Sequence, residues 1–132
     1  MAWSDTAPRP QRALIDGAYL DRLAQALGQR GLDELLADGM IELADRLATL
    51  GALARAADRA AVAALSHDIV AVAGHMGLGA LSAAAAELNR ATRDARDQRM
   101  DAGRLAELAA PVIALGTPSL DALAARPAGS GD

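Results

Sequence analysis

The two histidines, His67 and His75, are the side chains of this sequence best suited to chemistry near neutral pH. An imidazole can act as a nucleophile, a proton carrier or a metal ligand. The two histidines lie eight residues apart, which does not match the i, i+4 spacing of a helical metal pair. The chain contains no cysteine, so thiolate metal sites, cysteine nucleophiles and disulfides are excluded. No second catalytic group accompanies either histidine, and an autonomous enzyme is therefore not expected.

The segment around His67 has the periodicity of an amphipathic helix. At about 100° per residue, four apolar side chains fall on one stripe that should face the core. These are Leu65, Ile69, Val72 and Met76. His67 points away from that stripe, and its neighbours on the same face are all small or short. They are Ala60, Ala63, Ala64, Val70, Ala71 and Gly74. Exposed helix positions usually carry long polar side chains, so this smooth face is a candidate docking surface; an ordinary surface histidine in an alanine-rich chain is the alternative.

The elements that must position His67 are predicted to be helices. Of the 132 residues, 35 are Ala and 20 are Leu, whereas Val and Ile number four each and Phe is absent. A β-sheet fold needs β-branched and aromatic side chains, so this composition favours an all-α fold. Apolar spacing predicts helices over about 15–27, 32–53, 58–77 and 78–96, and a fifth that begins at Asp101. Such helices pack as an antiparallel four-helix bundle, with the first helix as an additional N-terminal lid.

The helix ends are marked by aspartate, glycine and proline. Asp58 is an expected N-cap, and Gly77 is expected where a helix ends with a positive φ. Pro111 should kink the last helix or end its first half. The pair Thr117 and Pro118 should restart a short final helix, because threonine caps well and proline suits the first helical position.

The predicted organisation is one helical domain, residues 14–126, between a flexible arm at 1–13 and a flexible tail at 127–132. The arm lacks the apolar core of a signal peptide. The longest uncharged run, 69–86, is interpreted as two helix faces joined at a turn, not as a membrane span. We therefore expect a cytoplasmic monomer without membrane contact.

The charged residues exclude several further classes of function. The formal net charge is −4, and all 13 basic residues are arginine. A chain without lysine has no P-loop lysine and no Schiff base, and its acidic balance argues against binding to nucleic acid. The charged run from Arg90 to Arg99 is expected to form a salt-bridged, exposed helix end. Asp68 is expected to be solvated, and His75 to be a flanking residue near the end of its helix.

The segment from Leu65 to Gly77, with the sequence LSHDIVAVAGHMG, resembles the signature of the histidine-containing phosphotransfer (HPt) domain family. That signature is a histidine followed by an aliphatic residue, usually Lys-Gly, small residues and an aliphatic-glycine pair. The positions that match are His67, Ile69, Ala73, Met76 and Gly77. Asp58 stands where the family often opens the histidine helix with aspartate, and the resemblance covers roughly residues 15–110.

The resemblance implies a carrier in a bacterial-type multistep phosphorelay of two-component signalling, with His67 as the phosphoacceptor. The partners would be the receiver domain of a hybrid histidine kinase and that of a response regulator. The receiver would supply Mg²⁺, so no cofactor is expected on this chain. Two positions depart from the family pattern: Val70 replaces the common lysine and Ala71 the glycine. Arg90 or Arg93 is a candidate for the missing cation.

Two other classes of function remain open at this point. The chain can be an HPt-like binding module that docks a receiver domain or a kinase without being phosphorylated, and Val70 in place of lysine is the feature that favours this. It can also be a purely structural helical bundle, which predicts no affinity for a receiver domain.

Overall fold

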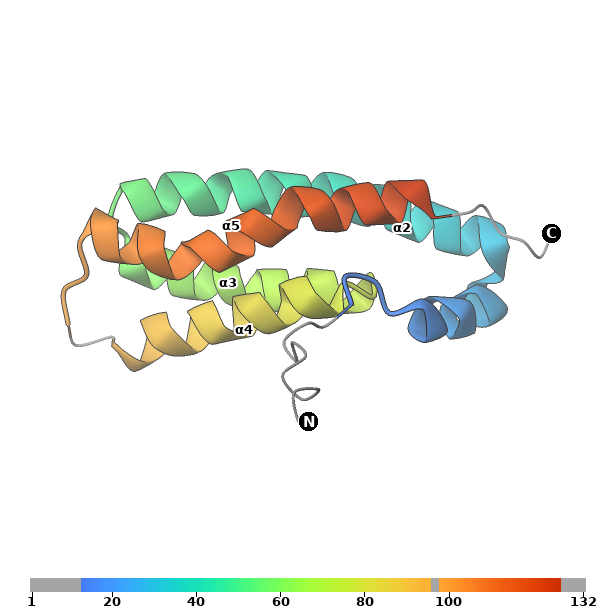
Figure 1. The fold of residues 1–132 in the computed structure, drawn as a ribbon, viewed down its shortest axis with the longest axis horizontal. Coiled ribbons are helices and arrows are strands. Elements are labelled where there is room, and N and C mark those ends of the chain that lie inside the picture. The colour runs from blue at the N-terminus through green and yellow to red at the C-terminus, as the bar shows by residue number, and fades with distance from the viewer. Residues whose placement is uncertain (1–12, 96–97, 127–132) are drawn as a thin grey trace, which may run out of the picture.

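The computed structural model describes residues 13–95 and 98–126, and within these ranges the chain forms four helices and no strand. They are α2 (Gly17–Arg55), α3 (Arg59–His75), α4 (Gly79–Asp94) and α5 (Ala102–Ala125). Residues 1–12 of the predicted arm at 1–13 and the predicted tail at 127–132 lie outside the described residues. The prediction of an all-α helical bundle is confirmed (Figure 1).

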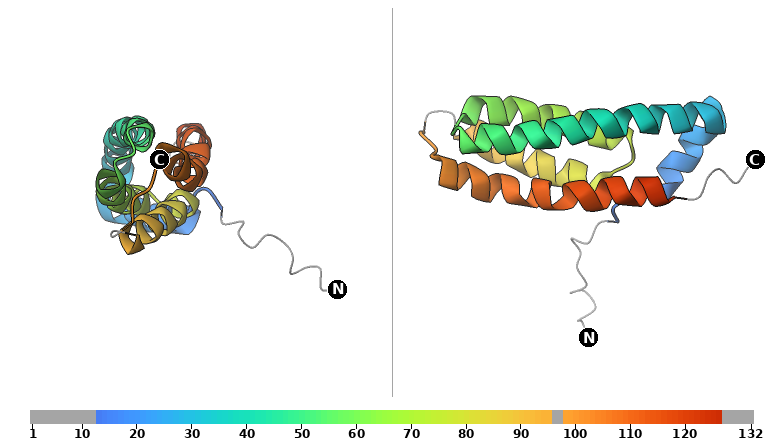
Figure 2. Two further views of the ribbon diagram at one scale, coloured as in Figure 1. Left: turned by 90° about the vertical axis from the view of Figure 1, so that its left-hand side faces the viewer. Right: turned by 90° about the horizontal axis from the view of Figure 1, so that it is seen from above.

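The four helices form a closed ring in which each helix packs on the next and α5 returns to α2 (Figure 2). Leucine fills most of the centre of this ring. The fully buried leucines of the core are Leu20, Leu32, Leu43, Leu50, Leu78, Leu81, Leu88 and Leu105. Removing their apolar surface from water is the main favourable contribution to folding, at about 25 cal/mol per Å². The bundle is thus a rigid frame on which surface side chains are held in place.

Helix α2 contains a break at Gly28, where the backbone has φ 80° and ψ 158°. A side chain with a Cβ rarely adopts a positive φ, so glycine at this position lets the chain change direction. The first helical segment, 17–27, leaves the axis of the rest of α2 (Figure 1) and buries Leu20 against the core. The boundary expected between the helical segments 15–27 and 32–53 is therefore present at Gly28, the first of the two glycines that separate them; the second, Gly31, lies inside the second segment.

Three predicted helix ends are confirmed: the starts at Asp58 and Asp101 and the end at Gly77. The carboxylate of Asp58 accepts a hydrogen bond from the Ala61 amide at 3.1 Å, and that of Asp101 accepts one from the Arg104 amide at 2.8 Å. Each bond satisfies an amide that has no partner inside its helix. Gly77 follows the last residues of α3 with φ 73°, as expected for a left-handed turn.

The prediction of a short final helix that restarts at Thr117 and Pro118 is wrong, because α5 continues through both prolines. One core-facing stripe runs across Pro111 and Pro118 without interruption. Its members are Leu105, Ala109, Val112, Gly116, Ser119 and Leu123. Both prolines are on the exposed side, where water can bond the carbonyls that lose their amide partner. Packing of the continuous stripe therefore outweighs the local signal to restart.

The run 69–86 forms the end of α3, a turn and the start of α4, which confirms its interpretation as two helices joined at a turn. Among the described residues, α5 alone is long and apolar enough to cross a membrane, by length and composition. Core helices of soluble proteins pass the same test, so this property of α5 is weak support for a membrane span.

A candidate functional site on helix α3

His67 lies in the middle of α3 and is exposed, as predicted from the periodicity. The buried face of α3 differs from the predicted one. It consists of Val62, Ser66, Ile69 and Ala73, whereas Leu65 and Val72 are half-buried. The core-facing stripe is therefore rotated towards the small residues Ser66 and Ala73. The physical reason is that short side chains let α4 approach α3 closely, so they become buried although they are only weakly apolar.

Two side chains of α4 bond to backbone carbonyls of α3 on either side of His67. Asn89 donates from Nδ2 to the carbonyl of Ala63 at 2.8 Å, and Ser82 donates from Oγ to the carbonyl of Val70 at 3.0 Å. These bonds set the antiparallel register of the two helices. Because His67 lies between Ala63 and Val70 along α3, the register places it opposite the middle of α4, near residues 85 and 86.

The predicted docking residues divide into two groups. Ala60, Ala64, Ala71 and Gly74 are exposed on the outer side of α3, together with His67. Ala63 and Val70 are only half-exposed because α4 packs beside them, and Val70 also packs against the core. Ala63 and Val70 are therefore less open to a partner than the other four predicted docking residues. The open part of the surface is narrower and flanks the seam between α3 and α4.

Sequence reasoning missed the contribution of α4 to this surface. Ser82 and Asn89 border the seam and lie seven residues apart, which is two helical turns, with Ala86 on the same stripe between them. The seven-residue spacing of Ser82 and Asn89 is the sequence signal that could have placed both on one face of α4. The face cannot be recognised from hydropathy, because every residue from 83 to 86 is alanine. The amide of Asn89 and the hydroxyl of Ser82 hold α3 in place beside His67.

Within the described part of the chain, no hydrogen bond joins a nearby arginine to His67. Arg90 pairs with Glu87 at 3.1 Å, and both side chains are exposed. Arg59 donates from Nη1 to the Thr92 carbonyl at 2.7 Å, which ties the start of α3 to the end of α4. The expected salt bridges within the run 90–99 are absent among its described members, and residues 96–97 lie outside the described ranges. The run is interrupted because α4 ends at Asp94.

His75 has a different setting, at the last position of α3. Its carbonyl accepts a hydrogen bond from the hydroxyl of Tyr19 at 3.0 Å. His75 lines a small hollow of about 150 Å³ between α2 and α3, together with Asp38 and Glu42. No group of three side chains suited to holding a metal occurs in 13–95 or 98–126. His75 is a residue at the helix end, as predicted.

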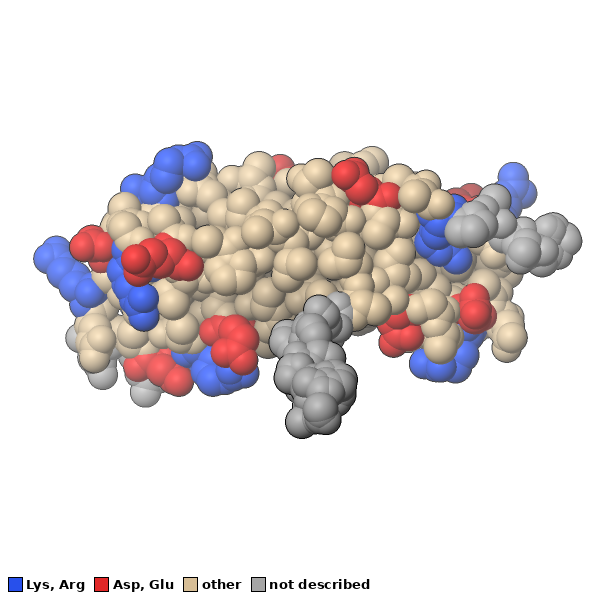
Figure 3. All heavy atoms as spheres, viewed as in Figure 1, with Lys and Arg blue, Asp and Glu red and all other residues tan. Residues whose placement is uncertain are grey.

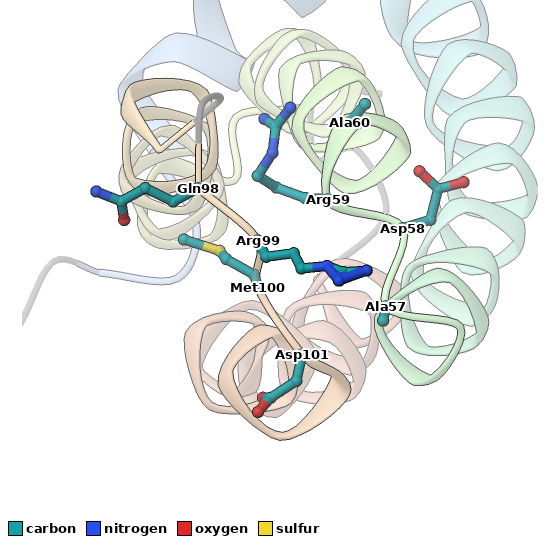
Figure 4. A pocket seen from close by; sticks show the side chains of 8 residues that line it. All are labelled: Ala57, Asp58, Arg59, Ala60, Gln98, Arg99, Met100 and Asp101. Carbon is teal, nitrogen blue, oxygen red and sulfur yellow. The ribbon is translucent and has the colours of Figure 1, made fainter.

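A depression of about 680 Å³ lies at the opposite end of the bundle (Figure 4). It is formed where α3 and α5 begin, and three of its polar side chains already have hydrogen-bond partners. Asp58 and Asp101 cap the two helices, and the guanidinium of Arg59 bonds to α4. Figure 4 shows Arg99 extended across the opening. His67 stands about two turns further along α3. Ala60 lies both in the lining of this depression and on the open side of α3.

No family model, no curated protein and no solved structure matches this chain. The description of the site therefore rests on its own residues: one exposed imidazole on a smooth helix, fixed by two bonds from the neighbouring helix.

Proposed function

We propose that this chain is an HPt-like phosphoryl carrier that accepts a phosphoryl group on His67 and passes it to an aspartate of a receiver domain. The observation that carries the proposal is the exposure of His67 in mid-helix among small side chains. The first helical segment, 17–27, would be the additional lid helix of such a bundle. We place the chain in the cytoplasm as a monomer that meets receiver domains of a hybrid kinase and of a response regulator.

The chemistry requires little from the carrier. A ring nitrogen of neutral His67 attacks the phosphorus of an aspartyl phosphate, and a P–N bond forms as the P–O bond to the aspartate breaks. The aspartate leaves as a carboxylate, and the imidazole loses a proton to solvent. The receiver contributes Mg²⁺ and most of the stabilisation of charge in the transition state. The carrier needs an accessible, oriented imidazole and a surface on which the receiver can dock.

The surface around His67 supports such docking in two ways. Ala64, Ala71 and Gly74 are exposed and short, so a partner backbone can come close to the imidazole. The bonds from Ser82 and Asn89 to α3 hold the helix in place, which lowers the entropic cost of orienting His67. A rigid, smooth surface with one reactive atom is what in-line phosphoryl transfer between two proteins requires.

The experiment that tests the proposal is incubation of the chain with a panel of receiver domains phosphorylated on aspartate. Label should move to this chain, be lost in acid and survive in base, as a phosphoramidate does and an acyl phosphate does not. Incubation with a small phosphodonor, which needs no docking, tests the imidazole separately. If neither route labels the chain, phosphoryl transfer through His67 is wrong.

A binding module without chemistry is the second candidate, and one observation favours it. Val70 occupies the position of the family's common lysine, and Arg90 pairs with Glu87 instead of His67. Such a module would bind a receiver domain or a kinase without acquiring label. Calorimetry with the same receiver panel separates the two candidates, and the absence of all binding would indicate a purely structural bundle.

A further inference from the structure

A groove of about 280 Å³ lies between α4 and α5, and its lining is mostly apolar. Its apolar residues are Ala84, Leu88 and Ala91 of α4 with Leu108 and Pro111 of α5. Leu88 is buried at the floor of the groove, and the two alanines beside it, Ala84 and Ala91, are short, so a gap remains next to the larger side chains of α5. Its volume suits one large side chain rather than a helix, and small-molecule pockets are usually larger, at about 300–1,000 Å³.

The described chain begins on the same side of the bundle as this groove. The amide of Asp16 donates to the carbonyl of Gly77 at 2.8 Å, which fixes the start of the chain at the turn between α3 and α4. Both views in Figure 2 place the blue start of the ribbon on the side where α4 and α5 adjoin. Figure 3 shows that side, with charged side chains towards the two ends and few in the middle. Residues 1–12 thus connect to the bundle next to an uncovered apolar surface.

We propose that residues 1–12 occupy this groove and seat Trp3 beside Leu88 and Leu108. The length of the segment permits it. The groove residues lie five to twelve positions beyond Gly79 in α4, about 8–18 Å along the helix axis. The ten residues from Trp3 to Ala13 can span up to about 35 Å. Trp3 is the single tryptophan of the chain, and its indole combines a large apolar surface with one N–H donor.

The charges of the segment and of the groove are complementary. Glu87 and Glu107 lie at the edges of the groove, one on each helix. Arg9 and Arg12 stand between Trp3 and the start of the described chain. Each glutamate also pairs with an arginine of its own helix, but exposed pairs of this kind are weak and can be shared with an incoming guanidinium. The contact leaves His67 on α3 uncovered, so it is independent of the proposed phosphotransfer.

The single tryptophan makes the test direct in the full-length chain. Seated in the groove, Trp3 should emit at shorter wavelength than in the urea-unfolded chain and be quenched several-fold less by acrylamide, at any protein concentration. Ala84→Glu should return both properties to the unfolded values while helicity is kept. The matched variant Ala48→Glu, on the exposed side of α2, should change neither. Emission of the folded wild type equal to that in urea would overturn the proposal. So would a shift that appears only at high concentration, which would place the segment on a second copy.

A second measurement keeps the proposal testable if Ala84→Glu unfolds the bundle. Because the chain has no cysteine, Glu87→Cys can be labelled singly with a nitroxide that quenches tryptophan on contact. Strong quenching of Trp3 from that position, with little from a label at Ala48→Cys, is the expected result. Equal quenching from the two positions would contradict a seat between α4 and α5.

Discussion

The two histidines of α3 show how strongly position on one helix decides what a side chain can do. His67 stands in mid-helix among alanines, whereas His75 ends the helix and lines a hollow with Asp38 and Glu42. A phosphoryl group carries close to two negative charges, so nearby carboxylates disfavour it. The backbone of His75 also anchors Tyr19. We therefore expect the imidazole of His67 to be the better acceptor of an anion, whereas His75 takes part in a structural contact through its backbone carbonyl.

The largest expected effect distinguishes the two imidazoles directly. His67→Gln should abolish acid-labile label from phosphorylated receivers and from small phosphodonors, whereas His75→Gln should retain it. Both positions are exposed, so the free energy of unfolding should change by no more than about 0.5 kcal/mol in the His67 variant. Full labelling of the His67 variant would show that His67 is not the phosphoacceptor. A large loss of stability would mean that His67 is buried.

The next effect tests docking apart from chemistry. Ala71→Arg places a long charged side chain one turn from His67 and should weaken receiver binding by about 2 kcal/mol or more, roughly 30-fold. The control is Ala48→Arg on α2, which is also an exposed helical alanine and should leave affinity unchanged. Labelling by a small phosphodonor should persist in both variants. Equal affinities in calorimetry would remove this face as the docking surface.

Two glycines near His75 provide a matched pair for stability. Gly77→Ala adds a Cβ at φ 73°, about 3.2 Å from atoms of Leu20 and Tyr19, and should lower the free energy of unfolding by about 1–3 kcal/mol. Gly74→Ala adds a Cβ in a helical conformation, 3.6 Å from Ser82 Oγ, which is an ordinary contact. It should be neutral or stabilise by up to about 1 kcal/mol, because alanine favours the helix. Urea unfolding followed by circular dichroism measures both.

The smallest effect concerns the cation missing beside His67. Val70→Lys should lengthen the lifetime of the phosphorylated form by a factor that corresponds to about 1 kcal/mol or less, since an exposed ammonium is well solvated. Val70 packs partly against the core, so the lysine stem must follow the seam for its charge to reach solvent. Val70→Met controls for the change of shape without a charge. A slower transfer in the lysine variant alone would show that Val70 makes an apolar contact with the receiver.

Local signals in the sequence were enough to predict the helices and most of the residues at which they begin and end. Asp58 and Asp101 bond to the amides of their own helices, and Gly28 and Gly77 adopt a positive φ, because these preferences act within a few residues. The exposure of His67 also followed from periodicity alone, since it needed only the direction opposite to a group of apolar side chains.

Tertiary packing decided the details that matter for the site. The core face of α3 includes Ser66 and Ala73 in place of Leu65 and Val72, and α4 half-covers Ala63 and Val70. Hydropathy cannot foresee this, because small residues become buried only when a neighbouring helix comes close enough to cover them. The same cause keeps α5 continuous past Pro118: burial of Gly116 against Leu47 and of Leu123 in the core outweighs the local preference to restart. The sequence by itself determined where the helices lie and which way His67 points, and only the contacts between helices decided which of its neighbours remain open to a partner.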